Sequence, residues 1–350
     1  MNGEQVNKQK KNLYIVVGMP RSGTSAITRG LKALGIDLGD NFGSGNNKWN
    51  PTGFWEDKDI VYKINRGVSF ALNDNWMSVH LIDDQCRNNP VLSDLKLSAT
   101  HILQKRLAST SSWGFKDPRT SRVLPFWQEV FAELHLSDNY IIALRNPLAC
   151  ASSWRRLSGA DIEIGLLLWL IHLIPVINCT HGRNRLMVSY DLLMQNPRQQ
   201  LARIKDKLGI QSKVDPSDMD QYANYYLDKK LSHYEYSEED LKSHPAVAIA
   251  PICAHLYELF MKLAKDEIAF ESEAFSSTWQ TLKAEFDKVY PGFAYINSLL
   301  KKNKQLERKL RTIERSVPWK LIYPLRVLDD ALRALRRKTR EQRRLIKSYD

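Results

Sequence analysis

The chain has few cysteines and no long apolar run, and these two shortages exclude several classes of protein. Its four cysteines stand far apart in 350 residues and form no C-x-x-C pair, which excludes a disulfide scaffold and makes a zinc site unexpected. The longest apolar run, Ile164 to Ile177, contains His172 and Pro175 and is shorter than the ~20 residues that a membrane-spanning helix needs. We therefore expect this run to form a buried core helix.

The N-terminal segment also lacks an apolar stretch. Residues 1–12 (MNGEQVNKQKKN) are polar, so the sequence predicts a disordered N-terminus and no secretory signal. Thiols in such a chain are reduced by default, and a cytoplasmic protein is expected. A composition of 43% hydrophobic and 26% charged residues is typical of a folded globular protein.

Acidic residues are scarce only at the C-terminal end. Residues 301–350 contain 17 Lys and Arg against 6 Asp and Glu, whereas the first 300 residues contain 34 against 33. The net charge of +12 therefore belongs almost wholly to a tail. Neither part carries a recognised nucleic-acid-binding module, so no nucleic-acid partner is expected.

Short apolar runs that favour strands alternate with segments of helical spacing. The expected strands are 13–17, 113–116, 140–144 and 186–189, and the expected helices among them are 24–34, 57–72, 92–107, 121–134 and 147–157. This alternation indicates an α/β fold, a parallel sheet flanked by helices with a helical C-terminal extension. The predicted domains are a core over 13–235, a helical completion of it over 236–295 and a basic amphipathic helical tail over 296–350.

The first expected strand leads into a glycine-rich turn. Residues Gly18–Ser25 (GMPRSGTS) have the G-x-x-x-x-G spacing of a phosphate loop between a strand and a helix, so the sheet is expected to be of the P-loop type. Backbone N–H groups of residues 21–25 and the positive end of the next helix converge there on one oxyanion. Arg21 adds a cation within this loop. Three of its residues can add hydroxyl donors: Ser22, Thr24 and Ser25.

One position of this loop argues against a nucleoside triphosphatase. Thr24 follows Gly23 where those enzymes have the lysine that reaches the outer phosphates. ATP or GTP hydrolysis is therefore disfavoured.

The segment P-R-S-G-T-S after an apolar strand resembles the 5′-phosphosulfate loop of the sulfotransferases that use 3′-phosphoadenosine 5′-phosphosulfate (PAPS). A second segment, from Leu144 to Ser153, is similar to the 3′-phosphate site of that family, with Arg145 and Ser153 eight residues apart. The resemblance covers roughly Leu13 to Ile210 and implies PAPS as the donor and no metal. The donor-binding residues that it implies are Arg21, Ser22, Gly23, Thr24, Ser25, Arg145, Ser153 and Tyr190.

Chemistry supports the second segment apart from the resemblance. An Arg at the carboxyl end of a strand and a Ser on the next helix can both bond one dianionic phosphate. The alternatives are a surface salt bridge for Arg145 and a bond to its own helix backbone for Ser153. For Tyr190, a core aromatic residue is nearly as good an interpretation.

Lys116 and Asp117 stand where another strand turns into a helix, in the segment GFKDPRT. A similar Lys-Asp-Pro occurs in Golgi tyrosylprotein sulfotransferases and related bacterial enzymes, which implies that Lys116 stabilises charge on the bridging oxygen of the leaving group. The alternatives are an exposed lysine and, for Asp117, a helix cap. The R-K-G-x-x-G segment of cytosolic aryl and steroid sulfotransferases is missing, so a phenol or steroid acceptor is disfavoured.

Sulfuryl transfer also needs a base for the proton of the acceptor hydroxyl. Glu56, in the loop after the phosphate site, is the first candidate, because related enzymes place an acidic base there. Alternatively, Glu56 and Asp57 only complement a helix dipole. His80 is the second candidate base. The indoles of Trp49, Trp55 and Trp76 are candidates for stacking on sugar faces, with core packing as the alternative.

These features predict a PAPS-dependent sulfotransferase that acts on a hydroxyl of a saccharide or lipid-linked saccharide, bound for a bacterial cell-surface polysaccharide or glycolipid. The alternatives are a P-loop kinase that uses ATP and a non-catalytic membrane or scaffold protein on the same fold. The basic tail, residues 301–350, suits peripheral contact with the inner face of an anionic membrane. A solvated helix or a homomeric coiled coil has equal weight for the tail, so a homo-oligomer stays open.

Overall fold

A computed structural model describes residues 10–43, 53–82, 89–227 and 234–346. The chain divides into unit 1, Met1–Phe293, and unit 2, Ala294–Asp350. Of the expected disordered N-terminus, residues 1–9 lie outside the described residues. Asn12, which was counted in that segment, is instead the first residue of a strand that pairs with Ser112 and Ser137.

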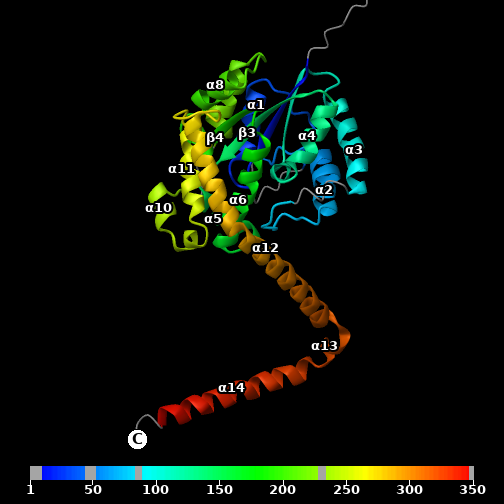
Figure 1. Cartoon of the computed structure of the whole chain (residues 1–350). Coiled ribbons are helices and arrows are strands. Elements are labelled where there is room, and N and C mark those ends of the chain that lie inside the picture. Colours follow the sequence, from blue (N-terminus) through cyan, green and yellow to red (C-terminus); the bar gives the residue numbers. More distant parts are fainter. Residues whose placement is uncertain (1–9, 44–52, 83–88, 228–233, 347–350) are drawn as a thin grey trace, which may run out of the picture. The chain divides into compact units, whose positions relative to one another are not determined.

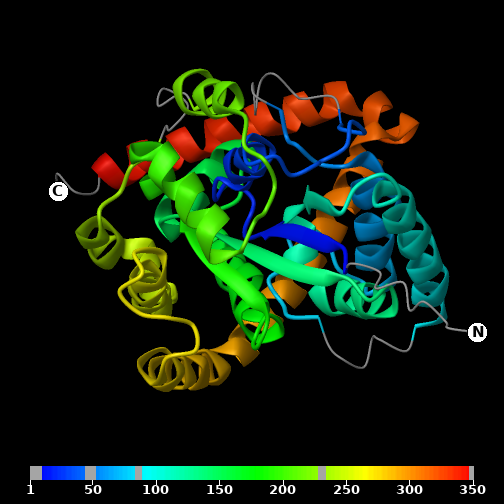
Figure 2. The same ribbon diagram turned by 90° about the horizontal axis from the view of Figure 1, so that it is seen from above.

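Four parallel strands form the sheet at the centre of unit 1, and in Figure 2 the blue strand β1 lies in the middle of this unit with helices around it. They are β1 (Asn12–Val17), β2 (Ser112–Lys116), β3 (Ser137–Leu144) and β4 (Asn184–Ser189), in the spatial order β2-β1-β3-β4. The register pairs Val16 with Lys116 and Leu144 with Ser189. The expected parallel sheet is confirmed, and the carboxyl ends of all four strands lie at one edge.

Helices cover this sheet on both sides, which confirms the α/β fold class. Figure 1 shows α2, α3 and α4 together at one side of the sheet and α10 and α11 at the other. The α-helices of the sheet region are α1 (Thr24–Ala33), α2 (Arg66–Ala71), α3 (Pro90–Arg106), α4 (Leu124–Glu133), α5 (Pro147–Ser158), α6 (Ile162–Cys179), α7 (Tyr190–Gln195) and α8 (Pro197–Lys207). Those after them are α9 (Pro216–Gln221), α10 (Glu238–Ser243) and α11 (Ile252–Ala264). The helix expected over 57–72 consists of a π-helical segment η1 (Asp59–Asn65) followed by α2.

The apolar run of the sequence forms α6, and the expected buried helix is confirmed. Trp169 and His172 are 0% and 3% exposed. Among the described residues, α6 is the one helix whose length and composition would suffice to cross a membrane, and 67% of it is buried within the protein. Its closest packing partner is α5, where Gly165 approaches Ala151.

Only helices follow Glu238 among the described residues, as expected. Unit 2 begins within α12 (Glu273–Arg315) and continues through α13 (Val317–Leu321) and α14 (Tyr323–Ile346). Ser316 separates α12 from α13, because its hydroxyl accepts a hydrogen bond from the Trp319 N–H and so caps the new helix. Between α13 and α14, the Arg326 guanidinium of α14 lies 3.8 Å from the centre of the Trp319 ring of α13.

The histidine in α6 predicts how stability depends on pH. Burial lowers the pKa of His172 from 6.5 to about 3, so the folded protein keeps the ring neutral where the unfolded chain binds a proton. Between these two pH values the free energy of unfolding should fall with decreasing pH, by up to about 1.4 kcal/mol per pH unit from this group. Urea unfolding of the wild type and of His172→Gln at several pH values measures this contribution.

For His172→Gln, the free energy of unfolding should change less with pH than for the wild type between pH 6.5 and about 5. This interval lies above the range in which carboxylates titrate. His101→Gln, at an exposed site on α3, is the matched control and should keep the wild-type slope. Equal slopes for His172→Gln and the wild type would contradict the neutral buried ring.

Candidate active site

The carboxyl edge of the sheet collects the residues that the sequence singles out. The glycine-rich loop follows β1, Lys116 is the last residue of β2, Arg145 follows β3 and Tyr190 follows β4. Open parallel sheets bind ligands at this edge, because the loops there diverge and helix N-termini point toward it. Residues from four separate segments of the sequence are thereby brought to one side of unit 1.

The glycine-rich loop has the backbone of an anion-binding turn. Gly18, Arg21 and Gly23 have φ angles of 144°, 74° and 88°, and Gly23 is the N-cap of α1. Ser121 holds the start of the loop, since its Oγ accepts from the Gly18 N–H at 2.8 Å. A left-handed residue next to a helix N-terminus turns successive N–H groups toward one point, and the first N–H groups of a helix have no partner within it.

Two of the three loop hydroxyls, those of Ser22 and Ser25, form hydrogen bonds within the protein. Ser22 is 1% exposed, and its Oγ donates to the Met19 carbonyl at 2.7 Å. The Ser25 hydroxyl donates to the Phe54 carbonyl at 3.2 Å. The first bond closes the loop, and the second joins the start of α1 to the segment before Glu56, so these two hydroxyls hold the loop in place.

Tyr190 fixes the position of the loop, a role that the sequence does not indicate. A Cβ added to Gly23 would lie 2.3 Å from Cδ2 of the Tyr190 ring. The Arg145 guanidinium lies 4.5 Å from the centre of the same ring. Tyr190 is therefore packed between the phosphate loop and Arg145, which combines the two interpretations given for it, a core aromatic residue and a neighbour of the binding site.

Arg21, Arg145 and Ser153 form one cluster, the arginine cluster. Arg21 Nε donates to Ser153 Oγ at 2.9 Å, and Arg145 Nη1 donates to the Arg21 carbonyl at 3.2 Å. Burial, and next the neighbouring Arg145 charge, lower the pKa of Arg21 from its usual value. Arg145 is 7% exposed, so it is not a surface salt bridge. Two guanidinium groups this close to each other suit a multivalent anion.

A buried ion pair lies at the end of β2. Lys116 Nζ is 2.8 Å from Glu56 Oε1, with side-chain exposures of 2% and 18%. Lys116 is thus not an exposed lysine. The alternative given for both acids, an interaction with the positive start of a helix, applies to Asp57, because its Oδ1 accepts from the Asp59 N–H at 2.8 Å and from the Ile60 N–H at 3.2 Å. The first candidate base and the expected electrostatic catalyst, which are sixty residues apart in sequence, are in direct contact.

Asp117, the residue after Lys116, caps the short helix that follows β2. Its Oδ1 accepts from the Arg119 N–H at 3.0 Å, which is the capping role considered for it. Burial raises the pKa of Asp117, and Asn65 Nδ2 donates to its Oδ2 at 2.9 Å. Asn65 is 0% exposed and also accepts from Trp127 Nε1 at 2.7 Å. Nothing in the sequence marks this asparagine, because its partners Asp117 and Trp127 are 52 and 62 residues away in the chain.

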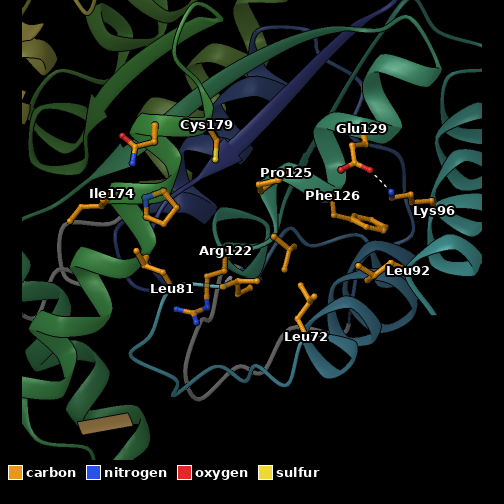
Figure 3. A pocket seen from close by; sticks show the side chains of 14 residues that line it. Leu72, Leu81, Leu92, Lys96, Arg122, Pro125, Phe126, Glu129, Ile174 and Cys179 are labelled. Carbon is orange, nitrogen blue, oxygen red and sulfur yellow. Dashed lines mark hydrogen bonds and ion pairs between the residues drawn. The ribbon is translucent and has the colours of Figure 1, made fainter. Parts of the chain in front are cut away.

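His80, the second candidate base, lies beside a different feature. Its carbonyl accepts from Arg122 Nη2 at 2.9 Å, and Arg122 forms a buried ion pair with Asp74 at 2.7 Å. Arg122 lines an apolar pocket of about 380 Å³. Figure 3 shows the apolar side chains of this pocket turned toward one another, with the Lys96–Glu129 ion pair at one side.

The three indoles proposed for sugar stacking differ in their surroundings. Trp49 lies outside the described residues. Trp55 packs edge-on against Phe42 and lies 5.6 Å from the Arg29 guanidinium, so much of its surface is covered. Trp76 is 49% exposed and packs edge-on against Trp154, the residue after Ser153. Only Trp76 among the described two presents a large exposed surface.

No group of three or more His, Cys, Asp or Glu side chains that could hold a metal ion occurs among the described residues. The donors at the carboxyl edge are instead backbone N–H groups, guanidinium groups and an ammonium group. This set suits a ligand with separate phosphate-like groups.

Comparisons with known proteins find similarity among solved structures. The sulfotransferase domain of the Synechococcus PCC 7002 olefin synthase has a TM-score of 0.38 at 14% identity and covers 81% of this chain and 98% of its own. The sulfotransferase domain from the curacin biosynthetic pathway has a TM-score of 0.37 at 15% identity, covering 61% and 78%. Sulfotransferase STF1 from Mycobacterium tuberculosis H37Rv has a TM-score of 0.37 at 14% identity, covering 67% and 76%.

These three structures are sulfotransferases, the class whose motifs the sequence resembles. No family model and no curated protein matches the chain.

The contact between Gly23 and Tyr190 predicts unequal costs for two alanine substitutions. Gly23 and Gly182 have φ angles of 88° and 69°, so alanine is strained at both, by about 1–3 kcal/mol. At Gly182 nothing lies within 4 Å of the new Cβ, whereas at Gly23 the Tyr190 ring must move. Gly23→Ala should therefore lose a further ~1–3 kcal/mol of unfolding free energy. Urea unfolding of both variants tests this, and equal losses would contradict the close approach.

Proposed function

We propose that the protein is a sulfotransferase that moves a sulfuryl group from PAPS to a hydroxyl of a saccharide. One observation carries this proposal. A phosphate loop with threonine in place of the triphosphatase lysine, the arginine cluster and the Lys116–Glu56 pair occupy the same edge of the sheet. An anion-binding loop alone would suit many nucleotide-binding proteins. The arginine cluster, together with a candidate base, Glu56, next to the buried Lys116, suits sulfuryl transfer in particular.

The chemistry of the donor set supports binding of PAPS. The loop N–H groups at the start of α1 would hold the 5′-phosphosulfate, with the left-handed Gly23 leaving room for the close approach of the backbone. The arginine cluster would hold the 3′-phosphate through Arg145, Arg21 and Ser153. Arg21 belongs to both the loop and the cluster, so it would link the two anionic groups of one ligand.

The residues at the end of β2 support the transfer step. PAPS supplies the sulfuryl group when bound. Lys116 Nζ donates hydrogen bonds and balances negative charge that develops on the leaving side. Glu56 accepts the proton of the acceptor hydroxyl at its carboxylate. Because Lys116 holds Glu56 at 2.8 Å, the base is already oriented before an acceptor arrives.

The acceptor that we propose is a saccharide, free or lipid-linked, as in a bacterial surface polysaccharide or glycolipid. The exposed indole of Trp76 supports this, because it packs against Trp154, the residue after Ser153 on α5, and presents an apolar face. A P-loop kinase is less well supported, because Thr24 stands at the lysine position. A protein without turnover is less well supported, because the Lys116–Glu56 pair lies at the same edge of the sheet as the phosphate loop and the arginine cluster.

Arg145→Ala should weaken binding of adenosine 3′,5′-bisphosphate by about 10- to 150-fold, the loss of a hydrogen bond to a charged group worth about 1.5–3 kcal/mol. Arg155→Ala removes the same charge from an exposed site on α5 and should leave the affinity nearly unchanged. Isothermal titration calorimetry measures both variants, and their thermal unfolding checks that each is folded. Equal affinities for the two variants would remove Arg145 from the binding site.

Glu56→Gln should lower turnover by about 10²- to 10⁴-fold, because the amide cannot take the acceptor proton. The amide oxygen still accepts from Lys116, so the affinity for adenosine 3′,5′-bisphosphate should stay the same. Release of this product from PAPS in the presence of a saccharide panel measures turnover. Glu133→Gln, an exposed acid on α4, is the control. Full activity of Glu56→Gln together with inactivity of His80→Gln would move the base to His80.

We further propose that α14 lies on the cytoplasmic face of an anionic membrane. Leu325, Leu328 and Leu332 are 68%, 59% and 45% exposed and recur at helical spacing. The segment 323–346 contains eight Lys and Arg against three Asp and Glu. Each basic residue near an anionic surface contributes about 1 kcal/mol. An apolar stripe with a basic opposite face is typical of interfacial helices.

The wild type should sediment with vesicles that contain phosphatidylserine and stay in solution with phosphatidylcholine vesicles. A variant with Leu325→Ser, Leu328→Ser and Leu332→Ser keeps the charge of α14 and removes its apolar stripe. The amount of this variant that sediments with phosphatidylserine vesicles should be several-fold lower than for the wild type. A chain that ends at Ser316 should not bind. Undiminished binding by the shortened chain would place the membrane contact outside α14.

A further inference from the structure

Within unit 2, the last part of α12 carries exposed apolar side chains at regular spacing. Leu299, Leu306, Leu310 and Ile313 are 46%, 54%, 52% and 50% exposed. Together with the exposed Asn303 they recur at intervals of four, three, four and three residues. This is the 3.5-residue period of a coiled-coil seam. In the heptad notation, Asn303 and Leu310 take position a and the others position d.

The charges beside this seam are complementary to those of an identical helix. Lys302 and Lys309 fall at position g, and Glu307 and Glu314 fall at position e, and all four side chains are exposed. In a parallel pair, each g residue faces the e residue five positions further along the other helix. Lys302 would face Glu307 of the second copy, and Lys309 would face Glu314.

The opposite orientation brings like charges together. In an antiparallel pair, position g faces g and position e faces e, so lysines would meet lysines and glutamates would meet glutamates. Asn303 also fits a parallel pair, because one buried asparagine at position a fixes the register of the helices and favours two strands. Leu310 at position a with Ile313 at position d favours three- or four-stranded coiled coils. A two-stranded coil therefore requires that Asn303 and the charged pairs have the larger effect on the number of helices.

We propose that residues 296–315 form a parallel two-stranded coiled coil with a second copy of this chain. The occupant of the seam is the same chain because one helix supplies both the lysines and the glutamates in complementary positions. The interface is isologous, so it closes with two copies and leaves no free seam. The proposal does not depend on the catalytic function, and it uses a different segment from the membrane helix α14.

Sedimentation equilibrium of the full chain tests this proposal in vesicle-free buffer. The wild type should have about twice the 40.4 kDa mass of one chain. The variant with Lys302→Glu and Lys309→Glu should have half the wild-type mass, because glutamate then faces glutamate at every pair. The control with Lys304→Glu and Arg311→Glu changes the charge equally at position b, away from the seam, and should stay dimeric.

Reversing the charges at position e as well distinguishes specific pairing from a general effect of net charge. Adding Glu307→Lys and Glu314→Lys to the double variant at position g restores every pair and should restore the dimer. A monomeric wild type, a trimer or tetramer, or a dimer that persists in the double variant would each overturn the proposal. Failure of the fourfold variant to dimerise, while its thermal unfolding matches the wild type, would overturn the parallel pairing.

Discussion

Parallel strand pairing is the constraint on which the rest of the structure depends. Because β1 to β4 all run in one direction, the residues that follow them meet at one edge, although they come from four distant parts of the chain. For this reason the glycine loop, Lys116, Arg145 and Tyr190 all lie at the same edge of the sheet. Hydrogen bonds between the loops then refine the arrangement, as between Arg145 and the Arg21 carbonyl.

The site concentrates charge where burial makes charge costly. Removing an ion from water costs several kcal/mol, which a partner at close range only partly offsets. Lys116 with Glu56 and Arg122 with Asp74 are both largely buried pairs next to the sheet edge. The aromatic packing of Phe115 with Trp127 beneath β2 supplies apolar burial that compensates for them. The buried ion pairs at this edge thus orient charged groups at a cost in folding free energy.

The sequence predicted the strands and the glycine loop well, because their signals are local. Apolar runs and a glycine-rich turn at a helix start act within a few residues. The sequence did not predict the contact of Lys116 with Glu56, because the two residues are sixty positions apart in the chain. It also did not predict Asn65 or the contact of Tyr190 with Gly23, since each joins elements far apart in the chain.

The most direct measurement is the calorimetric affinity of the wild type for adenosine 3′,5′-bisphosphate, adenosine 5′-monophosphate and ATP, each without a metal ion. Only the first ligand presents a 3′-phosphate to the arginine cluster. A protein that binds PAPS at this site should bind the bisphosphate at least about tenfold more tightly than the monophosphate, as one charged hydrogen bond of about 1.5 kcal/mol would give. Equal binding of the three ligands, or tighter binding of ATP, would contradict the sulfotransferase function and favour a kinase.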